Sequence, residues 1–240
     1  MPNPTAAMLV IGDEILSGRT KDANTPYLAS ELTRAGVDLR EVRVISDDPD
    51  AIVAAVRALS AAHDVVFTSG GIGPTHDDIT AENVARAFGR PISVRDDARA
   101  ILAAYYQARD QELNDARLRM ARIPDGAALI DNPISAAPGF SIENVHVMAG
   151  VPTIFQAMVA SVLPTITGGA PILSQSLDVA RGEGDIAGPL TDLAARYPDL
   201  TFGSYPFMRS GAHGVNVVVR GSDGARVDAA MAELSKMFAE

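Results

Sequence analysis

Residues 65–80 read VVFTSGGIGPTHDDIT, an apolar run that leads into glycines and then into a pair of acids. The run Val65–Phe67 opens a buried strand. We predict a helix over Thr80–Phe88, one residue after the acidic pair. A strand, a loop and a helix in this order form the unit from which parallel α/β sheets are built.

The sequence before this stretch repeats the same alternation. Ala6–Ile11 is a short branched apolar run stopped by Gly12, which favours a central strand buried on both faces. Apolar residues at helical spacing predict a helix over Thr25–Ala35, and the alternating pattern of Val37–Ile45 predicts a second strand. A further helix opens at Asp47-Asp48-Pro49. This order predicts a three-layer α/β/α fold with a mainly parallel sheet.

The sequence after residue 88 predicts the rest of this domain and a smaller one. For the first domain we predict a helix within 96–110, strands near 127–130 and 145–148, and a helix from Pro152 to Leu163. Residues 167–171, TGGAP, have the composition of a linker. The remainder reads as strand, helix, strand, strand, helix, a small α+β domain. We therefore predict domains at 1–167 and 172–240.

The composition limits the class of partner. Lys and Arg number 20 against 30 Asp and Glu, which gives a formal charge of −10. We therefore expect neither nucleic acid nor an anionic membrane as a partner. The chain has no Cys, which excludes disulfides and thiolate metal sites. The apolar run Ala6–Ile11 is too short for a signal or membrane helix, so we expect a cytoplasmic protein.

Gly70, Gly71 and Gly73 predict a loop that binds an anion. Glycine lets backbone N–H groups approach a phosphate closely. The alternative is a tight turn between strand and helix. The segment lacks the Gly-Lys-Ser/Thr ending of the nucleotide-binding P-loop, and its spacing does not fit the dinucleotide fingerprint. We expect Gly71→Val to abolish ligand binding at a modest cost in stability.

Acidic residues follow three predicted strands, as Asp13-Glu14, Asp47-Asp48 and Asp77-Asp78. Each pair has an ordinary explanation as a helix cap or a charge near a helix amino terminus, and for Asp78 alone we expect capping. In a parallel sheet, however, the three pairs lie at one edge, where their repulsion is tolerable if a divalent cation sits among them. Mg²⁺ suits such oxygen ligands. His76 can serve as a ligand or proton acceptor, although a lone loop histidine is more often a surface group.

Three segments resemble a known family: 12–18, GDEILSG; Asn24 with 27–29, YLA; and above all 70–80, GGIGPTHDDIT. They are similar to the molybdopterin-binding-like domain of CinA, the competence/damage-inducible protein family. Matches at 123–127, 132–133, 137–140 and 150–152 extend the resemblance through the first domain, and 183–187 and 203–206 extend it into the second. Longer CinA-like chains carry an amidohydrolase domain, for which this chain has no room, so we expect the short form.

The resemblance implies a small-molecule ligand, either a nucleotide or a pterin phosphate. CinA-like members imply a metal-dependent ADP-ribose pyrophosphatase, with FAD or a related dinucleotide as another substrate. The same fold occurs in molybdopterin adenylyltransferases and in eukaryotic FAD synthases, so a transferase or a non-catalytic binding module remains open. Relatives are commonly dimers or trimers, which implies a homo-oligomer.

The expected site follows from the loop, the acids and the family's two acidic positions. The cofactor is a divalent metal, Mg²⁺, Mn²⁺ or Co²⁺. The catalytic candidates are Asp47, Asp78 and His76. The phosphate-binding candidates are Gly12, Ser69, Gly70, Gly71, Gly73 and Thr75. The metal ligands are Asp13, Asp47, Asp77 and Asp78.

Three departures from the family pattern bear on substrate preference or on activity itself. Met120 stands where Gln is usual, Ala136 where Thr is usual, and Ile154 in the segment where a carboxylate is usual.

Overall fold

The computed structural model describes residues 3–209 and 212–238. The outermost residues of the two predicted domains, 1–2 and 239–240, lie outside this part. The chain divides into two compact units, residues 1–169 and 170–240.

A six-stranded sheet forms the middle of the first unit, in the order β2-β1-β3-β8-β7-β6. Its strands are β1 (Thr5–Ile11), β2 (Asp38–Ile45), β3 (Val65–Ser69), β6 (Ala128–Ile130), β7 (Gly139–Ile142) and β8 (Val145–Met148). The first four in spatial order pair in parallel, whereas β7 and β6 add antiparallel at one edge. The predicted mainly parallel sheet is confirmed, with an antiparallel edge that the sequence did not predict.

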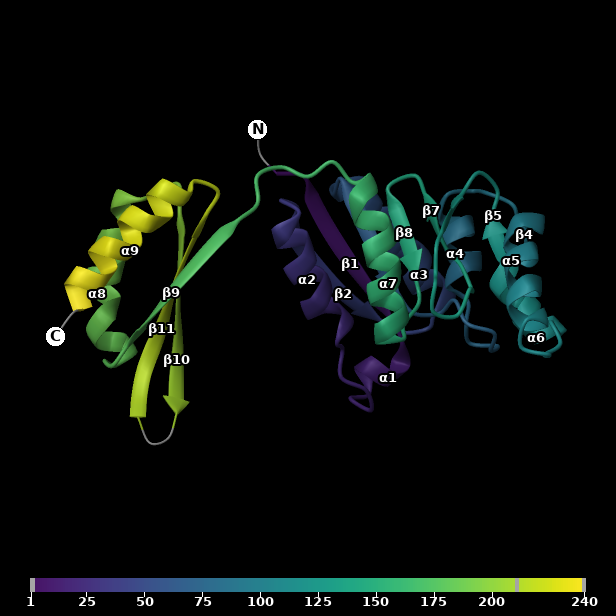
Figure 1. The fold of residues 1–240 in the computed structure, drawn as a ribbon, viewed down its shortest axis with the longest axis horizontal. Helices are drawn as coiled ribbons and strands as arrows, with labels where there is room; N and C mark the ends of the chain where they lie inside the picture. The colour runs from purple at the N-terminus through teal and green to yellow at the C-terminus, as the bar shows by residue number, and fades with distance from the viewer. Residues whose placement is uncertain (1–2, 210–211, 239–240) are drawn as a thin grey trace. The chain divides into compact units, whose positions relative to one another are not determined.

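Helices cover both faces of this sheet (Figure 1). The helices of the unit are α1 (Asp13–Leu16), α2 (Asn24–Arg34), α3 (Pro49–Ala62), α4 (Thr80–Ala87), α5 (Asp96–Gln107), α6 (Asp115–Leu118) and α7 (Pro152–Val162). Met8 and Val10 of β1 belong to the apolar core that includes α2 and α7, and Ala7 and Leu9 to the core that includes α3, α4 and α5. Strand β1 is therefore buried on both faces, and the three-layer α/β/α architecture is confirmed.

Several short elements were not predicted. They are α1, β4 (Ile92–Val94), β5 (Arg122–Pro124), β7, α6, and the 3₁₀ turns η1 (Arg119–Ala121) and η2 (Leu163–Thr165). None is longer than four residues. Such segments are too short to show a hydrophobic period.

The connections place a switch point beside β1. Helix α2 carries the chain from β1 to β2 on one side of β1, and α3 carries it back to β3 on the other side. At such a reversal the loops that leave adjacent strands diverge, and a crevice forms beyond the carboxyl ends of the strands. The loops after β1 and β3 are the ones that hold the glycines and acids.

The second unit has the predicted strand, helix, strand, strand, helix order. Its elements are β9 (Leu173–Val179), α8 (Glu183–Arg196), β10 (Thr201–Arg209), β11 (Ala212–Gly221) and α9 (Gly224–Phe238). The sheet is antiparallel, in the order β10-β11-β9. Alternate valines of β11 are buried with apolar residues of α8 and α9, so both helices pack on one face of this sheet.

Candidate functional site

Two of the three loop glycines are required by the backbone itself. Gly70 has φ +109° and Gly71 has φ +69°, conformations that other residues rarely adopt. A Cβ on Gly70 would lie 2.1 Å from the carbonyl oxygen of Ile11, and one on Gly71 would lie 2.1 Å from the buried Thr80 hydroxyl. The loop is thus packed against the end of β1 and the start of α4. Gly71→Val would therefore strain the fold, so the expectation of a modest stability cost is wrong.

Gly73 is glycine for a different reason. A Cβ at this position would lie 2.6 Å from Oδ2 of Asp78. The missing side chain leaves room for that carboxylate. Glycine at position 73 thus lets the Asp78 carboxylate lie against the glycine loop.

Asp78 does not cap the helix that follows it. Helix α4 begins at Thr80, and Ile79, the residue before it, makes no side-chain capping bond. The Asp78 carboxylate instead accepts hydrogen bonds from the backbone N–H of Thr75 at 2.8 Å and from its hydroxyl at 2.6 Å. The expectation of capping is wrong for Asp78. The Thr75 hydroxyl therefore donates its hydrogen bond to Asp78 and not to a phosphate.

The acids after β2 divide into a cap and a cavity residue. Asp48 caps α3 by accepting from the backbone N–H groups of Asp50 at 3.1 Å and Ala51 at 2.8 Å. The side chain of Asp47 turns the other way and accepts from the backbone N–H of Asp13 at 3.0 Å. This bond links the carboxyl ends of β1 and β2.

The Asp47 carboxyl lies near other carboxylates. Burial raises the pKa of its carboxyl above the ordinary value of 3.8, and the negative charges of Asp13, Glu14 and Asp77 raise it further, against the lowering effect of the Asp13 N–H bond. The three acidic segments therefore meet at one edge of the sheet, as the sequence predicts.

A cavity of about 570 Å³ opens at this edge. Its size is in the range of small-molecule sites. Seven of the predicted site residues line it: Gly12, Asp47, Gly70, Gly71, Gly73, Asp77 and Asp78. With Glu14 also in the lining, the loop and all three acidic pairs face one space.

Four predicted site residues do not line this cavity. Ser69 is buried, and its hydroxyl accepts from the Asn24 side chain at 2.8 Å. His76 is 99% exposed, 3.9 Å from Asp77. Thr75 is engaged by Asp78, and Asp13 contributes its backbone N–H while Glu14 takes the place in the cavity wall.

Several lining residues were missed as site candidates. They come from α1, from the segment after it and from the loops on the other wall of the cavity: Glu14, Arg19, Thr20, Met120, Asn132, Ser135, Val151 and Ile154. Asn132 organises its loop by donating to the Ala137 carbonyl at 2.8 Å and accepting from the N–H groups of Ile134 and Ser135. The Asn132-Pro133 motif was the available signal for this wall. Met120 and Ile154, two of the three departures from the family pattern, make part of the wall apolar.

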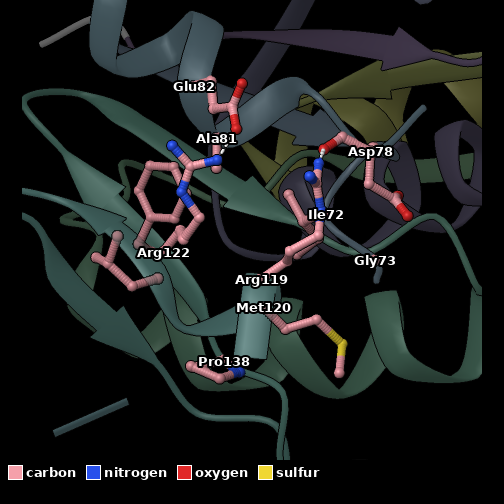
Figure 2. A pocket seen from close by; sticks show the side chains of 12 residues that line it. Ile72, Gly73, Asp78, Ala81, Glu82, Arg119, Met120, Arg122 and Pro138 are labelled. Carbon is pink, nitrogen blue, oxygen red and sulfur yellow. Dashed lines mark hydrogen bonds and ion pairs between the residues drawn. The ribbon is translucent and has the colours of Figure 1, made fainter. Parts of the chain in front are cut away.

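A second, much smaller space of about 20 Å³ lies behind the glycine loop (Figure 2). Figure 2 shows the Arg119 guanidinium directed at Asp78, whose backbone carbonyl accepts from it at 3.4 Å. Beside it, Arg122 pairs with Glu82 of α4. Arg119 thus supports the Asp78 segment from the smaller space.

The carboxylates of the cavity wall are the candidate ligands for a divalent metal. Within residues 3–209 and 212–238, no three His, Asp or Glu side chains converge closely enough to hold a metal by themselves. Mg²⁺ is usually bound through one or two carboxylates, with waters and substrate phosphates completing the shell. A pair of the aspartates that line the cavity fits this pattern, whereas a preformed all-protein cage does not.

No helix in the described part of the chain is long and apolar enough to cross a bilayer.

Family models match both units of the chain. Residues 7–168 match the model of a probable molybdopterin binding domain, and residues 171–240 match the model of the FAD synthase middle domain. The first match includes every residue that lines the main cavity.

Individual relatives agree with these matches. The chain is 34% identical over 205 residues to Protein PH0439 of Pyrococcus horikoshii, with 80% of each chain covered. It is 39% identical over 167 residues to a CinA-like protein of Citrifermentans bemidjiense, covering 68% of this chain and 40% of that one. A probable FAD synthase of Caenorhabditis elegans is 31% identical over 260 aligned positions, covering 98% of this chain and 50% of that one. The chain thus spans half or less of the last two relatives.

A solved structure supports the same assignment. The crystal structure of CinA from Thermoplasma acidophilum superposes with a TM-score of 0.62 at 34% sequence identity, covering 67% of this chain and 98% of that one. The chain therefore belongs to the CinA-like family of molybdopterin-binding-domain proteins.

Proposed function

We propose that this protein is a metal-dependent hydrolase of nucleotide diphosphate linkages, with ADP-ribose as the first candidate substrate and FAD or a related dinucleotide next. The observation that carries the proposal is the meeting of the glycine loop with carboxylates from separate strand ends around one cavity of about 570 Å³. The backbone N–H groups of a glycine loop can bind a phosphate, and carboxylates can bind a divalent metal.

Each group has a task in this proposal. Backbone N–H groups of the loop at Gly70, Gly71 and Gly73 hold phosphate oxygens. Asp47 and Asp78 hold the metal together with the substrate phosphate, with Asp77 beside them. When bound, the metal offsets charge on the phosphates and lowers the pKa of a bound water.

The reaction is a single hydrolysis. A water oxygen forms a bond to one phosphorus and the bridging P–O bond breaks, so ADP-ribose and water give AMP and ribose 5-phosphate. Asp47 would position the attacking water together with the metal, and the proton of that water would pass to solvent. The bridging oxygen leaves with the second phosphate.

A transferase of the molybdopterin adenylyltransferase type is the second candidate. It is favoured by the match of residues 7–168 to a molybdopterin binding domain. The FAD synthase relative, and the match of the second unit to a FAD synthase middle domain, also point to nucleotide or pterin chemistry. A non-catalytic binding module is the third candidate, since Met120 and Ile154 make one wall of the cavity apolar.

One substrate panel separates the three. The protein is incubated with ADP-ribose, with FAD, and with ATP plus molybdopterin, each with Mg²⁺, Mn²⁺ or Co²⁺, and the products are resolved by chromatography. The proposal predicts AMP from ADP-ribose or FAD only when metal is added. Adenylylated molybdopterin as the sole product would establish the transferase, and retention of unchanged ligand would establish the binding module.

A further inference from the structure

Arg19 is the one cation among the residues that line the main cavity in the described part of the chain. We infer that Arg19, with the Thr20 hydroxyl beside it, forms a second anion subsite, which takes the distal phosphate of a nucleoside diphosphate group. The inference rests on the proposed function and deepens it, because it assigns the residue that recognises the second of the two linked phosphates.

The first argument is that Arg19 is unpaired although carboxylates line the same cavity. Glu14, Asp47, Asp77 and Asp78 line the same cavity. Even so, within the described residues the guanidinium of Arg19 makes no hydrogen bond and no ion pair. Its donors, which suit bidentate binding of phosphate, are left for a ligand.

The second argument is the contrast with the two arginines behind the loop. Arg119 is used on the Asp78 carbonyl and Arg122 on Glu82, and both line the smaller space of about 20 Å³. These side chains support the protein. Arg19 makes no such contact.

The third argument is that the backbone which carries Arg19 is fixed. After the short helix α1, the N–H of Gly18 donates to the Ile15 carbonyl at 3.1 Å, and the N–H of Thr20 donates to the Glu14 carbonyl at 3.0 Å. Gly18, with φ +73°, makes the turn between these bonds. The position of the Arg19 Cα is therefore set by the same segment that places Glu14 in the cavity.

The fourth argument is charge. A cavity lined by four carboxylates repels an anionic ligand unless cations offset them. A metal at Asp47 and Asp78 offsets charge around one phosphate. A second phosphate then needs its own cation, and Arg19 is the one in the described lining. A nucleoside monophosphate has no group for this subsite.

The test is equilibrium binding, measured by isothermal titration calorimetry with Mg²⁺ present. The probes are AMP and α,β-methylene-ADP, whose P–C–P bridge is not hydrolysed. The variants are Arg19→Gln and Arg19→Lys. The matched control is Arg99→Gln, because Arg99 is an exposed arginine of α5 that does not line this cavity.

The inference predicts that Arg19→Gln weakens binding of α,β-methylene-ADP by about tenfold or more and binding of AMP by less than about threefold. The affinity of Arg19→Lys for α,β-methylene-ADP should lie between those of the wild type and Arg19→Gln, because lysine keeps the positive charge but lacks the bidentate guanidinium. Arg99→Gln should bind both probes as the wild type does. Thermal melts establish that every variant is folded.

Two other outcomes would each overturn the inference, and they differ in what they say about the proposed function. If the wild type binds both probes and Arg19→Gln weakens neither, or weakens both equally, the subsite is overturned while the proposed function stands. If the wild type binds neither probe, the proposed function falls, and this inference falls with it.

Discussion

The Asp47 carboxylate accepts a hydrogen bond from the backbone N–H of Asp13, with 3.0 Å between the two atoms. Because Asp13 follows β1 and Asp47 follows β2, this bond joins the ends of two adjacent parallel strands. It keeps the Asp47 carboxylate at the cavity, while its neighbour Asp48 caps α3. Two consecutive aspartates thus have different roles, which makes them a useful pair for experiments.

The first prediction is that Asp47→Asn stabilises the metal-free protein at neutral pH. Burial raises the pKa of Asp47 above 3.8, so the folded protein binds this proton more tightly than the unfolded chain does. The favourable contribution of protonated Asp47 is complete below pH 3.8 and is lost as the pH rises through the raised pKa. Asn can still accept the Asp13 N–H bond but carries no charge.

Urea unfolding at a series of pH values, in EDTA, measures this effect. The free energy of unfolding of Asp47→Asn should exceed that of the wild type near pH 7, and the difference should shrink toward pH 3.8, the ordinary pKa of Asp. Added Mg²⁺ should narrow the difference at pH 7 by stabilising the wild type. A variant less stable than the wild type at every pH would contradict the argument.

The second prediction concerns Asp78→Asn. Asn can accept from the Thr75 N–H and hydroxyl as Asp78 does, so the free energy of unfolding should change by less than about 1 kcal/mol. Loss of the charge should lower metal-dependent turnover of ADP-ribose by about 100-fold or more, if the carboxylate holds the metal. Asp48→Asn is the control, because Asn caps a helix as well as Asp does. Equal activity of the two variants would remove Asp78 from the site.

The sequence predicts the central strands, the main helices and the meeting of the three acidic pairs, because these depend on long apolar patterns and on parallel order. It does not predict the role of each acid within a pair. Asp48 rather than Asp47 caps α3, and Glu14 rather than Asp13 faces the cavity, since each choice depends on the backbone angle at one turn. Arg19 is missed for a related reason. A single arginine after a short helix carries no pattern until the cavity beside it is known.

The third prediction separates the roles of the loop glycines. Gly73→Ala adds a Cβ 2.6 Å from Oδ2 of Asp78 at an ordinary φ, so it should displace that carboxylate, lower turnover at least about tenfold and leave stability nearly unchanged. Gly71→Ala adds a Cβ 2.1 Å from the buried Thr80 hydroxyl at φ +69°. It should destabilise the fold by about 2 kcal/mol or more.

Gly126→Ala is the matched control for Gly71→Ala. Gly126 has φ +82° and no atom within 4 Å of an added Cβ. Gly126→Ala should therefore lower the free energy of unfolding only through the unfavourable backbone conformation, by about 1 kcal/mol. Thermal or urea unfolding of the three variants gives the comparison. Equal destabilisation by Gly71→Ala and Gly126→Ala would show that the contact with Thr80 is unimportant.

The fourth prediction is that His76→Ala retains turnover. The His76 side chain is 99% exposed and does not line the cavity. Its removal should change kcat/KM for ADP-ribose by less than about threefold. A loss of about 100-fold would mean that the loop closes over the substrate and brings His76 to the phosphates.

The last prediction is that Asp47 and Asp78 act as one unit. Both line the cavity, and in the proposed function a metal held there depends on both carboxylates and on the substrate phosphate. Either Asn variant should then lower kcat/KM for ADP-ribose by about 100-fold. The kcat/KM of the double variant should be less than about tenfold below that of the less active single variant, because the loss of one carboxylate already disables the metal site. Titration with Mn²⁺ should show weaker metal binding in both single variants, and EDTA should abolish wild-type turnover. Multiplicative losses in the double variant, with Mn²⁺ affinity unchanged in one of the single variants, would mean that the two carboxylates serve separate steps and that only one of them holds metal.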